Sequence, residues 1–272
     1  MRIGNREFDV KNHTYIMGIL NVTPDSFSDG GKWNDFDNAL AHTEQMIADG
    51  ADIIDIGGES TRPGHQQISE EEEIARVVPI IEAVKKRFDV PVSIDSYKSN
   101  VAEAGVQAGA DLINDIWGLM YDERMGDVIR EYQVACCLMQ NRKKADYQNF
   151  EVDFMNDLRK IVTLAKRKGI ADDKIMLDPG VGFGKSYENN LSAIANVGMM
   201  HELGYPILLA TSRKSFIDKT IHVPVNERLE GTLATTVLGV TSHCGFVRVH
   251  DVLENKRIIQ MTEAILARKL EK

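Results

Sequence analysis

The sequence predicts an α/β fold, a single (β/α)8 barrel of eight parallel strands with a short N-terminal extension. Eight short apolar runs alternate with helical patterns along nearly the whole chain of 272 residues. No Pro-, Gly- or Ser-rich linker interrupts the series, and eight βα units in about 250 residues is the size of a closed barrel. We therefore expect one domain over residues 1–272. A length prior of ~150 residues per domain allows two domains, and a doubly wound open sheet is the competing fold.

The eight apolar runs have the length and composition of strands that are buried on both faces. In chain order they are 14–20, 52–56, 91–94, 111–116, 134–139, 174–177, 206–210 and 245–249. The 13 residues before the first run are expected to cover the bottom of the barrel.

Between the strands, apolar residues recur at the i, i+3, i+4, i+7 spacing of amphipathic helices. Gly50 and Gly169 stand where a helix C-terminus favours glycine. Ser69 and Glu72 have the spacing of a capping box, so the acidic run that follows Ser69 is expected to begin a helix. Clear stripes occur at 36–49, 70–87 and 153–168, and weaker ones at 122–131 and 188–203.

Composition restricts the class of partner. The 41 Asp and Glu exceed the 32 Lys and Arg, for a net charge of −9, which argues against a nonspecific grip on nucleic acid or anionic lipid. No apolar run approaches the ~18 residues needed to cross a bilayer. Cys136, Cys137 and Cys244 form neither a disulfide framework nor a C-x-x-C metal pattern. We expect a cytoplasmic protein that binds neither nucleic acid nor a membrane.

In a barrel of this kind the chemistry lies at the C-terminal ends of the strands. Each predicted strand ends in polar or ionic residues, namely Asn21, Glu59 with Ser60, Thr61 and Arg62, Asp95, Asn114 with Asp115, Gln140, Asp178, Ser212 with Arg213 and Lys214, and Arg248 with His250. Helix N-caps would explain some of the Asp, Asn and Ser residues. They cannot explain Lys214, Arg248 or His250.

The alternation of side chains along the last predicted strand indicates which way Arg248 and His250 point. In the segment 246–250, Arg248 and His250 share one face, and Val247 and Val249 share the other. The valines should face the helices, which leaves a cation and an imidazole in the barrel mouth, a pair suited to a phosphate or diphosphate. The alternative is a buried arginine that pairs with a structural carboxylate.

Long motifs at the strand ends occur in the order of one known family. Met17–Gly31 reads MGILNVTPDSFSDGG and Asp55–Gly64 reads DIGGESTRPG, and both resemble signatures of the dihydropteroate synthase family. Further matching segments are Ser93–Ser96, Ile113–Ile116, Leu177–Lys185, Thr211–Phe216 and Val247–Asp251. The resemblance covers the chain from about Tyr15 to its last helix.

The resemblance implies a TIM barrel of folate biosynthesis. Its members condense 6-hydroxymethyl-7,8-dihydropterin diphosphate with p-aminobenzoate to give 7,8-dihydropteroate and pyrophosphate, with Mg²⁺, and homodimers and sensitivity to sulfonamides are expected. The pterin pocket would be lined by Asp95, Asn114, Asp178 and Lys214, with Met139 and Phe183 beside it. The diphosphate would be held by Asn21, Thr61, Arg62, Arg248 and His250, with Asn21 also on the metal. The aminobenzoate would be bordered by Pro63, Phe183, Lys214 and Ser215.

The residue types suit this reaction. Loss of diphosphate from the pterin methylene develops positive charge on the ring and negative charge on the leaving group. Asp95 can stabilise the first, and Arg248, His250 and Mg²⁺ can stabilise the second, with Lys214 as the fourth expected catalytic residue. An arylamine is neutral and nucleophilic at pH 7, so the residues favour an SN1-like displacement without a strong base.

The sequence has further features that the resemblance does not assign. Gln140 stands where many relatives have His, and 141–146 has no assigned role. Loops 22–33 and 60–68 hold few apolar residues, so we expect diphosphate to order them and to complete the p-aminobenzoate site. The functional alternatives are a pterin-binding methyltransferase domain and a catalytically silent pterin-binding barrel, which release of pyrophosphate would distinguish from a synthase.

Overall fold

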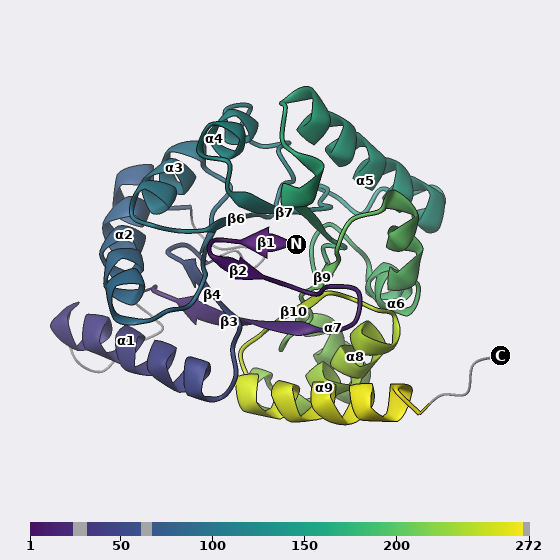
Figure 1. The fold of residues 1–272 in the computed structure, drawn as a ribbon. Coiled ribbons are helices and arrows are strands. Elements are labelled where there is room, and N and C mark those ends of the chain that lie inside the picture. The colour runs from purple at the N-terminus through teal and green to yellow at the C-terminus, as the bar shows by residue number, and fades with distance from the viewer. Residues whose placement is uncertain (24–31, 61–66, 269–272) are drawn as a thin grey trace.

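Eight parallel strands form a barrel in the computed structural model, which describes residues 1–23, 32–60 and 67–268. The strands lie in the order β8-β7-β6-β5-β4-β3-β10-β9. A parallel bridge between Leu177 in β8 and Ile207, just before β9, joins the two edges. The helices surround the barrel on its outside (Figure 1). The predicted barrel is confirmed, and the open doubly wound sheet was the wrong alternative.

The elements lie close to the predicted ranges, and the shortest barrel strand is β9. The barrel strands are β3 (Tyr15–Asn21), β4 (Ile53–Gly57), β5 (Val92–Asp95), β6 (Leu112–Asp115), β7 (Ala135–Met139), β8 (Ile175–Asp178), β9 (Leu208–Leu209) and β10 (Phe246–Val249). The helices are α1 (Lys32–Ala48), α2 (Glu70–Arg87), α3 (Ser99–Gln107), α4 (Met125–Tyr132), α5 (Phe150–Arg167), α6 (Tyr187–Ala195), α7 (Ser215–Ile221), α8 (Leu229–Thr241) and α9 (Val252–Leu266). Short 3₁₀ helices lie at η2 (Asp172–Lys174), η3 (Val197–Leu203) and η4 (Val225–Glu227).

The local signals act as predicted. Ser69 caps α2, because its side chain accepts a hydrogen bond from the backbone N–H of Glu72 at 3.2 Å. The carboxylate of Glu72 pairs with Arg76 instead of completing the capping box. Gly50 and Gly169 adopt positive φ angles of 103° and 79° just after α1 and α5, where glycine avoids the steric cost of a Cβ.

Alternate residues of each strand face two different cores, as the two-residue period of a strand requires. One core lies between the strands and the helices and includes Ile54, Ile113 and Val247. The other fills the barrel itself and includes Ile53, Leu112 and Phe246, the neighbours of those three residues. A side chain's position in the strand therefore decides whether it can reach the barrel interior.

The N-terminal extension closes one end of the barrel. An antiparallel hairpin of β1 (Arg2–Ile3) and β2 (Arg6–Glu7) lies across that end (Figure 1). Ile3 and Phe8 are part of the barrel-filling core, and the ring of Phe8 meets Tyr15 edge-on at 4.8 Å between centroids. The expectation that the first 13 residues cover the bottom is confirmed.

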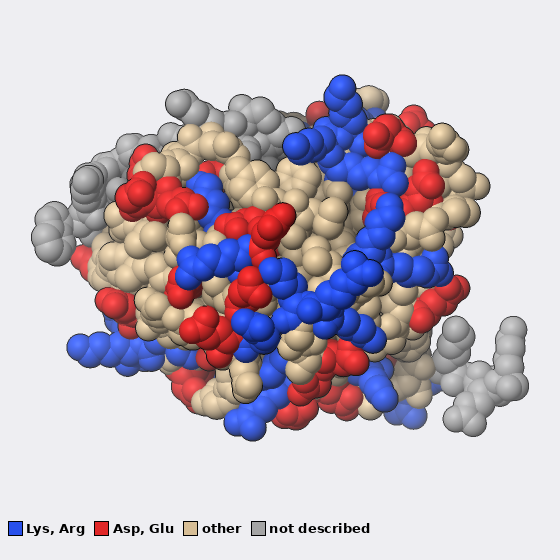
Figure 2. All heavy atoms as spheres, turned by 90° about the horizontal axis from the view of Figure 1, so that it is seen from above, with Lys and Arg blue, Asp and Glu red and all other residues tan. Residues whose placement is uncertain are grey.

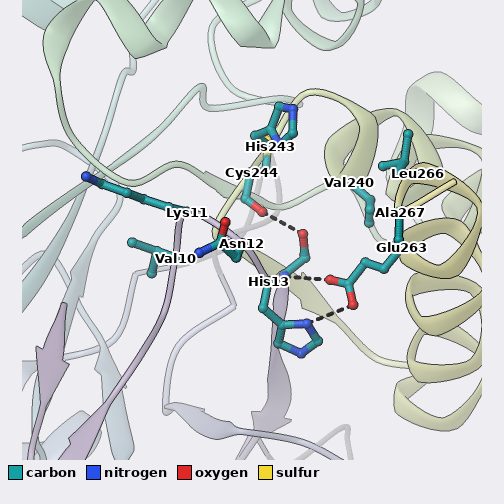
Figure 3. A pocket seen from close by; sticks show the side chains of 11 residues that line it. Val10, Lys11, Asn12, His13, Val240, His243, Cys244, Glu263, Leu266 and Ala267 are labelled. Carbon is teal, nitrogen blue, oxygen red and sulfur yellow. Dashed lines mark hydrogen bonds and ion pairs between the residues drawn. The ribbon is translucent and has the colours of Figure 1, made fainter. Parts of the chain in front are cut away.

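A cavity of about 210 Å³ lies beside this extension, between residues 10–14 and the end of α9 (Figure 3). Its polar groups bond to one another. His13 Nδ1 lies 2.8 Å from Glu263 Oε2, and the backbone N–H of Thr14 donates to Glu263 Oε1 at 2.9 Å. The Thr14 hydroxyl donates to the Cys244 carbonyl at 2.8 Å. These bonds fasten the extension to α9 and to the segment between α8 and β10, at the N-terminal end of the barrel and away from the strand C-termini.

The surface carries both signs of charge, and acidic and basic side chains interleave over the face shown in Figure 2. Within the described ranges, no helix combines the length and apolar character needed to cross a membrane.

Candidate active site

At the C-terminal end of the barrel, the inward face of the strands changes from apolar to polar. Two residues beyond Ile53, Leu112, Met176 and Phe246, the same strand faces carry Asp55, Asn114, Asp178 and Arg248. Asp95 ends β5 in the corresponding place. All four of the predicted residues in this set lie in the mouth, and the structure adds Asp55.

Arg248 joins two of these carboxylates. Its Nε donates to Asp55 Oδ2 at 2.6 Å, and its Nη2 donates to Asp95 Oδ2 at 2.5 Å. Asn114 Nδ2 also approaches Asp55 Oδ2, at 3.4 Å. Arg248 therefore points into the barrel mouth as predicted, and the alternative of pairing with buried carboxylates holds as well. A planar guanidinium can serve two carboxylates at once.

Two carboxylate oxygens in this group are buried without a partner among the described residues, Asp55 Oδ1 and Asp95 Oδ1. Burial raises the pKa of Asp95 to about 7, with the Arg248 charge opposing and the Asp55 charge adding to the shift. Buried acceptors are almost always hydrogen-bonded in proteins. These two oxygens are therefore candidates to receive the N–H groups, or the developing positive charge, of a bound ring.

Asp178 and Lys214 form the other side of the mouth. Asp178 Oδ1 accepts the backbone N–H of Gly180 at 2.6 Å, and burial raises the pKa of this carboxyl while the charge of Lys214 opposes the rise. Lys214 Nζ donates to the Val181 carbonyl at 2.5 Å and lies 4.9 Å from the centre of the Phe183 ring. Burial lowers the pKa of Lys214 to about 8, and Asp178 limits the fall.

An apolar cluster borders these charges. Tyr97, Ile116 and Met139 are buried together, and Trp117 and Phe183 pack against them. Flat apolar surfaces beside convergent hydrogen-bonding groups suit a planar aromatic ligand. The predicted neighbours of the pterin, Met139 and Phe183, are thus in one place.

His250 lies next to the loop that carries Lys214. The Ser212 hydroxyl accepts the backbone N–H of His250 at 3.2 Å and lies 2.9 Å from its Nδ1. Arg213 holds the two loops together through both carboxylate oxygens of Asp251.

Of the remaining predicted site residues, the structure describes Asn21 and Ser215 but not Thr61, Arg62 or Pro63. Asn21 ends β3 with the strand parity of the inward-facing Met17, and Ser215 is the exposed first residue of α7. Thr61, Arg62 and Pro63 lie outside the described residues, as does most of loop 22–33.

A buried ion cluster holds both stems of the loop that contains Thr61. Lys98 Nζ donates to Glu59 Oε2 at 2.6 Å, to Glu73 Oε2 at 2.8 Å and to the Ile68 carbonyl at 2.9 Å. Tyr97 donates from its hydroxyl to Glu59 Oε1 at 2.6 Å. Glu59 therefore has a structural partner rather than a place among the mouth carboxylates.

Two residues at strand ends point away from the mouth. Asp115 is turned toward the helices and accepts the backbone N–H groups of Trp117 and Leu119 at 2.8 and 2.6 Å. It holds the turn after β6 and is not a helix N-cap, since α4 begins only at Met125. Gln140 is fully buried and bonds to Asp157, Tyr147 and Lys185. Gln140 follows the inward-facing Met139 and therefore faces outward, away from the mouth.

Sequence reasoning missed Asp55, Tyr97 and Ile116 as site residues. The two-residue period could have found Asp55 and Ile116, which follow the inward-facing Ile53 and Asn114 by two positions. Tyr97 lies in a loop, where no such period applies.

Comparison with known proteins identifies the family. Residues 17–250 match the family described as pterin binding enzyme. The chain is 59% identical to the dihydropteroate synthase of Clostridium beijerinckii over 98% of this chain and 100% of that protein. A dihydropteroate synthase from Clostridium difficile, solved with pteroic acid, is 48% identical with a TM-score of 0.93, over 95% of this chain and 99% of that one.

A further similar structure is that of Xanthomonas albilineans dihydropteroate synthase with 4-aminobenzoic acid. It is 36% identical with a TM-score of 0.91, and the match covers 95% of each chain. The fold, the strand-end charges and these matches agree, and the chain belongs to the dihydropteroate synthase family of pterin-binding transferases.

Proposed function

We propose that this chain condenses 6-hydroxymethyl-7,8-dihydropterin diphosphate with p-aminobenzoate, giving 7,8-dihydropteroate and pyrophosphate. The observation that carries the proposal is Arg248, which joins Asp55 and Asp95 at the mouth. This arrangement sets carboxylates and a cation side by side where the reaction separates positive from negative charge. The pteroic acid and 4-aminobenzoic acid in the two similar structures belong to the same chemistry.

The pterin ring would bind against Met139 and Phe183, with its hydrogen-bonding edge toward Asp178 and Asn114. Asp178 uses Oδ1 for the Gly180 amide, so its other oxygen can accept ring N–H donors. A charge-assisted bond of this kind is about twice as strong as a neutral one. Asn114 offers both a donor and an acceptor.

The bond between the pterin methylene and the diphosphate oxygen breaks first in this scheme. Its electron pair leaves with the diphosphate, and the ring becomes cationic. Asp95, with an unpartnered oxygen and a negative charge above pH 7, stabilises the ring. Arg248 and His250 stabilise the leaving group, and the amine of p-aminobenzoate then attacks the methylene and loses a proton. In the proposal, Lys214 and Ser215 receive the benzoate carboxylate.

Mg²⁺ fits the donors present and is part of the proposal. The amide oxygen of Asn21 is a hard ligand, and Mg²⁺ takes few protein ligands when substrate phosphates and water complete its shell. The described residues hold no group of three or more His, Cys, Asp or Glu arranged for a metal. When bound, the ion would neutralise charge on the leaving group.

Homodimer formation and a cytoplasmic location complete the proposal. The outer helices α8 and α9 expose Leu238, Met261 and Ile265, with 46%, 59% and 59% of their surfaces accessible. Exposed apolar side chains on neighbouring helices favour association with a second copy, and analytical ultracentrifugation of wild type and Met261→Lys would test it.

The experiment that tests the function is release of pyrophosphate from the pterin diphosphate with and without p-aminobenzoate. Release that requires p-aminobenzoate and forms dihydropteroate supports the synthase. A methyltransferase domain or a silent barrel would bind a pterin and release none. Tight pterin binding with no p-aminobenzoate-dependent release would therefore overturn the proposal.

A further inference from the structure

We propose that Lys185 is a positioning residue for the p-aminobenzoate side of the site. Its ammonium fastens the β8–α6 loop, residues 179–186, to the end of β7, so that Phe183 stays against Lys214. The expected effect on p-aminobenzoate binding rests on the proposed function. The attachment of the loop can be tested without substrates. It gives a role to Gln140 and to the residues after it, which the reaction does not use.

Three acceptors surround the Lys185 ammonium. Nζ donates to Gln140 Oε1 at 2.5 Å, to the Gly180 carbonyl at 3.0 Å and to the Phe183 carbonyl at 3.3 Å. An ammonium has three N–H donors, so these bonds use all of them. Lys185 has no donor left for a substrate and acts through the residues it holds.

The acceptor that follows β7, the side chain of Gln140, is itself fixed. Gln140 is fully buried, and its Nε2 donates to Tyr147 Oη at 3.0 Å and to Asp157 Oδ2 at 3.1 Å. Arg142 Nε donates to the same Asp157 oxygen at 2.6 Å. The side-chain amide is therefore oriented with its oxygen toward Lys185, and the segment after β7 supplies the groups that orient it.

Backbone contacts show how closely the loop lies on this segment. Gly180 and Gly184 have positive φ angles of 67° and 51°. A Cβ on Gly180 would lie 1.9 Å from the Gln140 carbonyl oxygen, and one on Gly184 would lie 2.1 Å from the Arg142 carbonyl oxygen. No side chain fits at either place, so the two backbones are in direct contact at two points of the loop before Lys185.

The loop connects the Lys185 contacts to residues at the barrel mouth. The Phe183 carbonyl bonds to Lys185, and the Phe183 ring lies 4.9 Å from Lys214 Nζ. Lys214 in turn donates to the Val181 carbonyl of the same loop. If the loop moved, both the ring and the partner of Lys214 would move with it. Asn114 and Asp95 lie on strands and would keep their places.

The primary test compares Lys185→Met with Lys160→Met. Lys160 Nζ bonds at 3.2 Å to Asp157, the carboxylate that Gln140 and Arg142 also use. The Lys160 side chain is 70% exposed, and this bond does not reach the loop. Three loop amides report on the attachment, because the N–H groups of Gly180, Gly182 and Phe183 all donate hydrogen bonds. We expect hydrogen exchange over 179–186 to accelerate at least tenfold in Lys185→Met and to stay unchanged in Lys160→Met.

The functional arm measures binding in the same two variants. In Lys185→Met, the dissociation constant of p-aminobenzoate with pyrophosphate and Mg²⁺ should rise about tenfold, and its KM should rise alike. Calorimetric affinity for a pterin should fall by a clearly smaller factor, because Asn114 and Asp95 lie on strands and keep their places although Phe183 also borders the pterin. Tyr147→Phe, which removes one bond that orients Gln140, should give the same pattern at about two- to threefold and serves if Lys185→Met does not fold.

Unchanged exchange in the loop would overturn the attachment. Faster exchange with unchanged p-aminobenzoate affinity, or an equal loss of pterin and p-aminobenzoate affinity, would overturn the positioning role. Failure of the wild type to release pyrophosphate would instead contradict the proposed function, and the exchange data would still judge the attachment.

Discussion

The lower and upper halves of the barrel interior come from the same faces of the same strands, yet their chemistry is opposite. The lower half is apolar, with Phe246, Leu112 and Met176 packed under the N-terminal extension. Two residues further along those strands, the upper half holds Arg248, Asn114 and Asp178. A step of two residues along a strand thus separates the apolar layer that stabilises the fold from the polar layer that forms the site.

The difference shows what each half contributes. Burial of apolar surface in the lower half stabilises the fold by about 25 cal/mol per Å². Charges in the upper half lose hydration, and their pairing recovers that cost only in part. The cost is visible in the pKa values of Asp95 and Lys214, which burial moves to about 7 and about 8. Such perturbed groups are typical of functional sites.

The largest effect should come from Arg248→Lys. A lysine keeps the charge but cannot bridge Asp55 and Asp95 while it meets the diphosphate. We expect kcat/KM to fall about a thousandfold, which is about 4 kcal/mol of transition-state stabilisation. Steady-state release of pyrophosphate measures it.

Phe246→Leu is the matched control, two residues lower on the same face of β10. It should lower the free energy of unfolding by about 1–2 kcal/mol and leave kcat/KM per folded molecule unchanged. If both variants lost activity to the same extent, the division between the two halves would be wrong.

Asp178→Asn should have the next largest effect. The change replaces one acceptor with a donor facing ring donors, and we expect pterin binding to weaken by about 2–4 kcal/mol in a calorimetric titration. Asp115→Asn is the control, since Asp115 is equally buried but bonds to Trp117 and Leu119 on the helix side of its strand. It should reduce stability and leave pterin affinity intact. Wild-type pterin affinity in Asp178→Asn would remove Asp178 from the pocket.

The pH profile tests the charges of the upper half together. Asp95 must be ionised, so kcat/KM should fall as pH drops below about 7, the raised pKa of that carboxyl. Lys214 must be protonated, so kcat/KM should also fall as pH rises above about 8, its lowered pKa. Lys214→Arg stays protonated at high pH and should lose the alkaline limb. An alkaline limb that persists unchanged in Lys214→Arg would show that another group causes it.

The smallest expected effect concerns the order of binding. Diphosphate in the upper half should complete the outer pocket, so p-aminobenzoate should bind at least tenfold tighter, on the order of 1.4 kcal/mol, with pyrophosphate and Mg²⁺ than without them. Titration of labelled p-aminobenzoate under the two conditions measures the ratio. Equal affinities would mean that the outer pocket is already formed in the free protein.

Much of the division between the apolar lower half and the polar upper half of the barrel could be predicted from the sequence. The two-residue period of strands decides which side chains face the barrel interior. The period placed Arg248 and Val247 on opposite faces correctly, and the same rule would have separated Asn114 from Asp115 and Met139 from Gln140. It does not reach loops, which is why Tyr97 was missed. Nor could it show that Lys98 links Glu59 to Glu73, since such pairings depend on how α2 packs against the strands.

The most direct test of the central claim is a crystal structure of the chain with pteroic acid, pyrophosphate and Mg²⁺. We expect the pterin ring to lie above the apolar layer, with Asp178 and Asn114 within hydrogen-bond distance of its edge and pyrophosphate beside Arg248 and His250. A pterin bound elsewhere, or one in the mouth with Asp178 more than about 4 Å from any ring nitrogen, would contradict the claim that the upper half of the barrel is the active site.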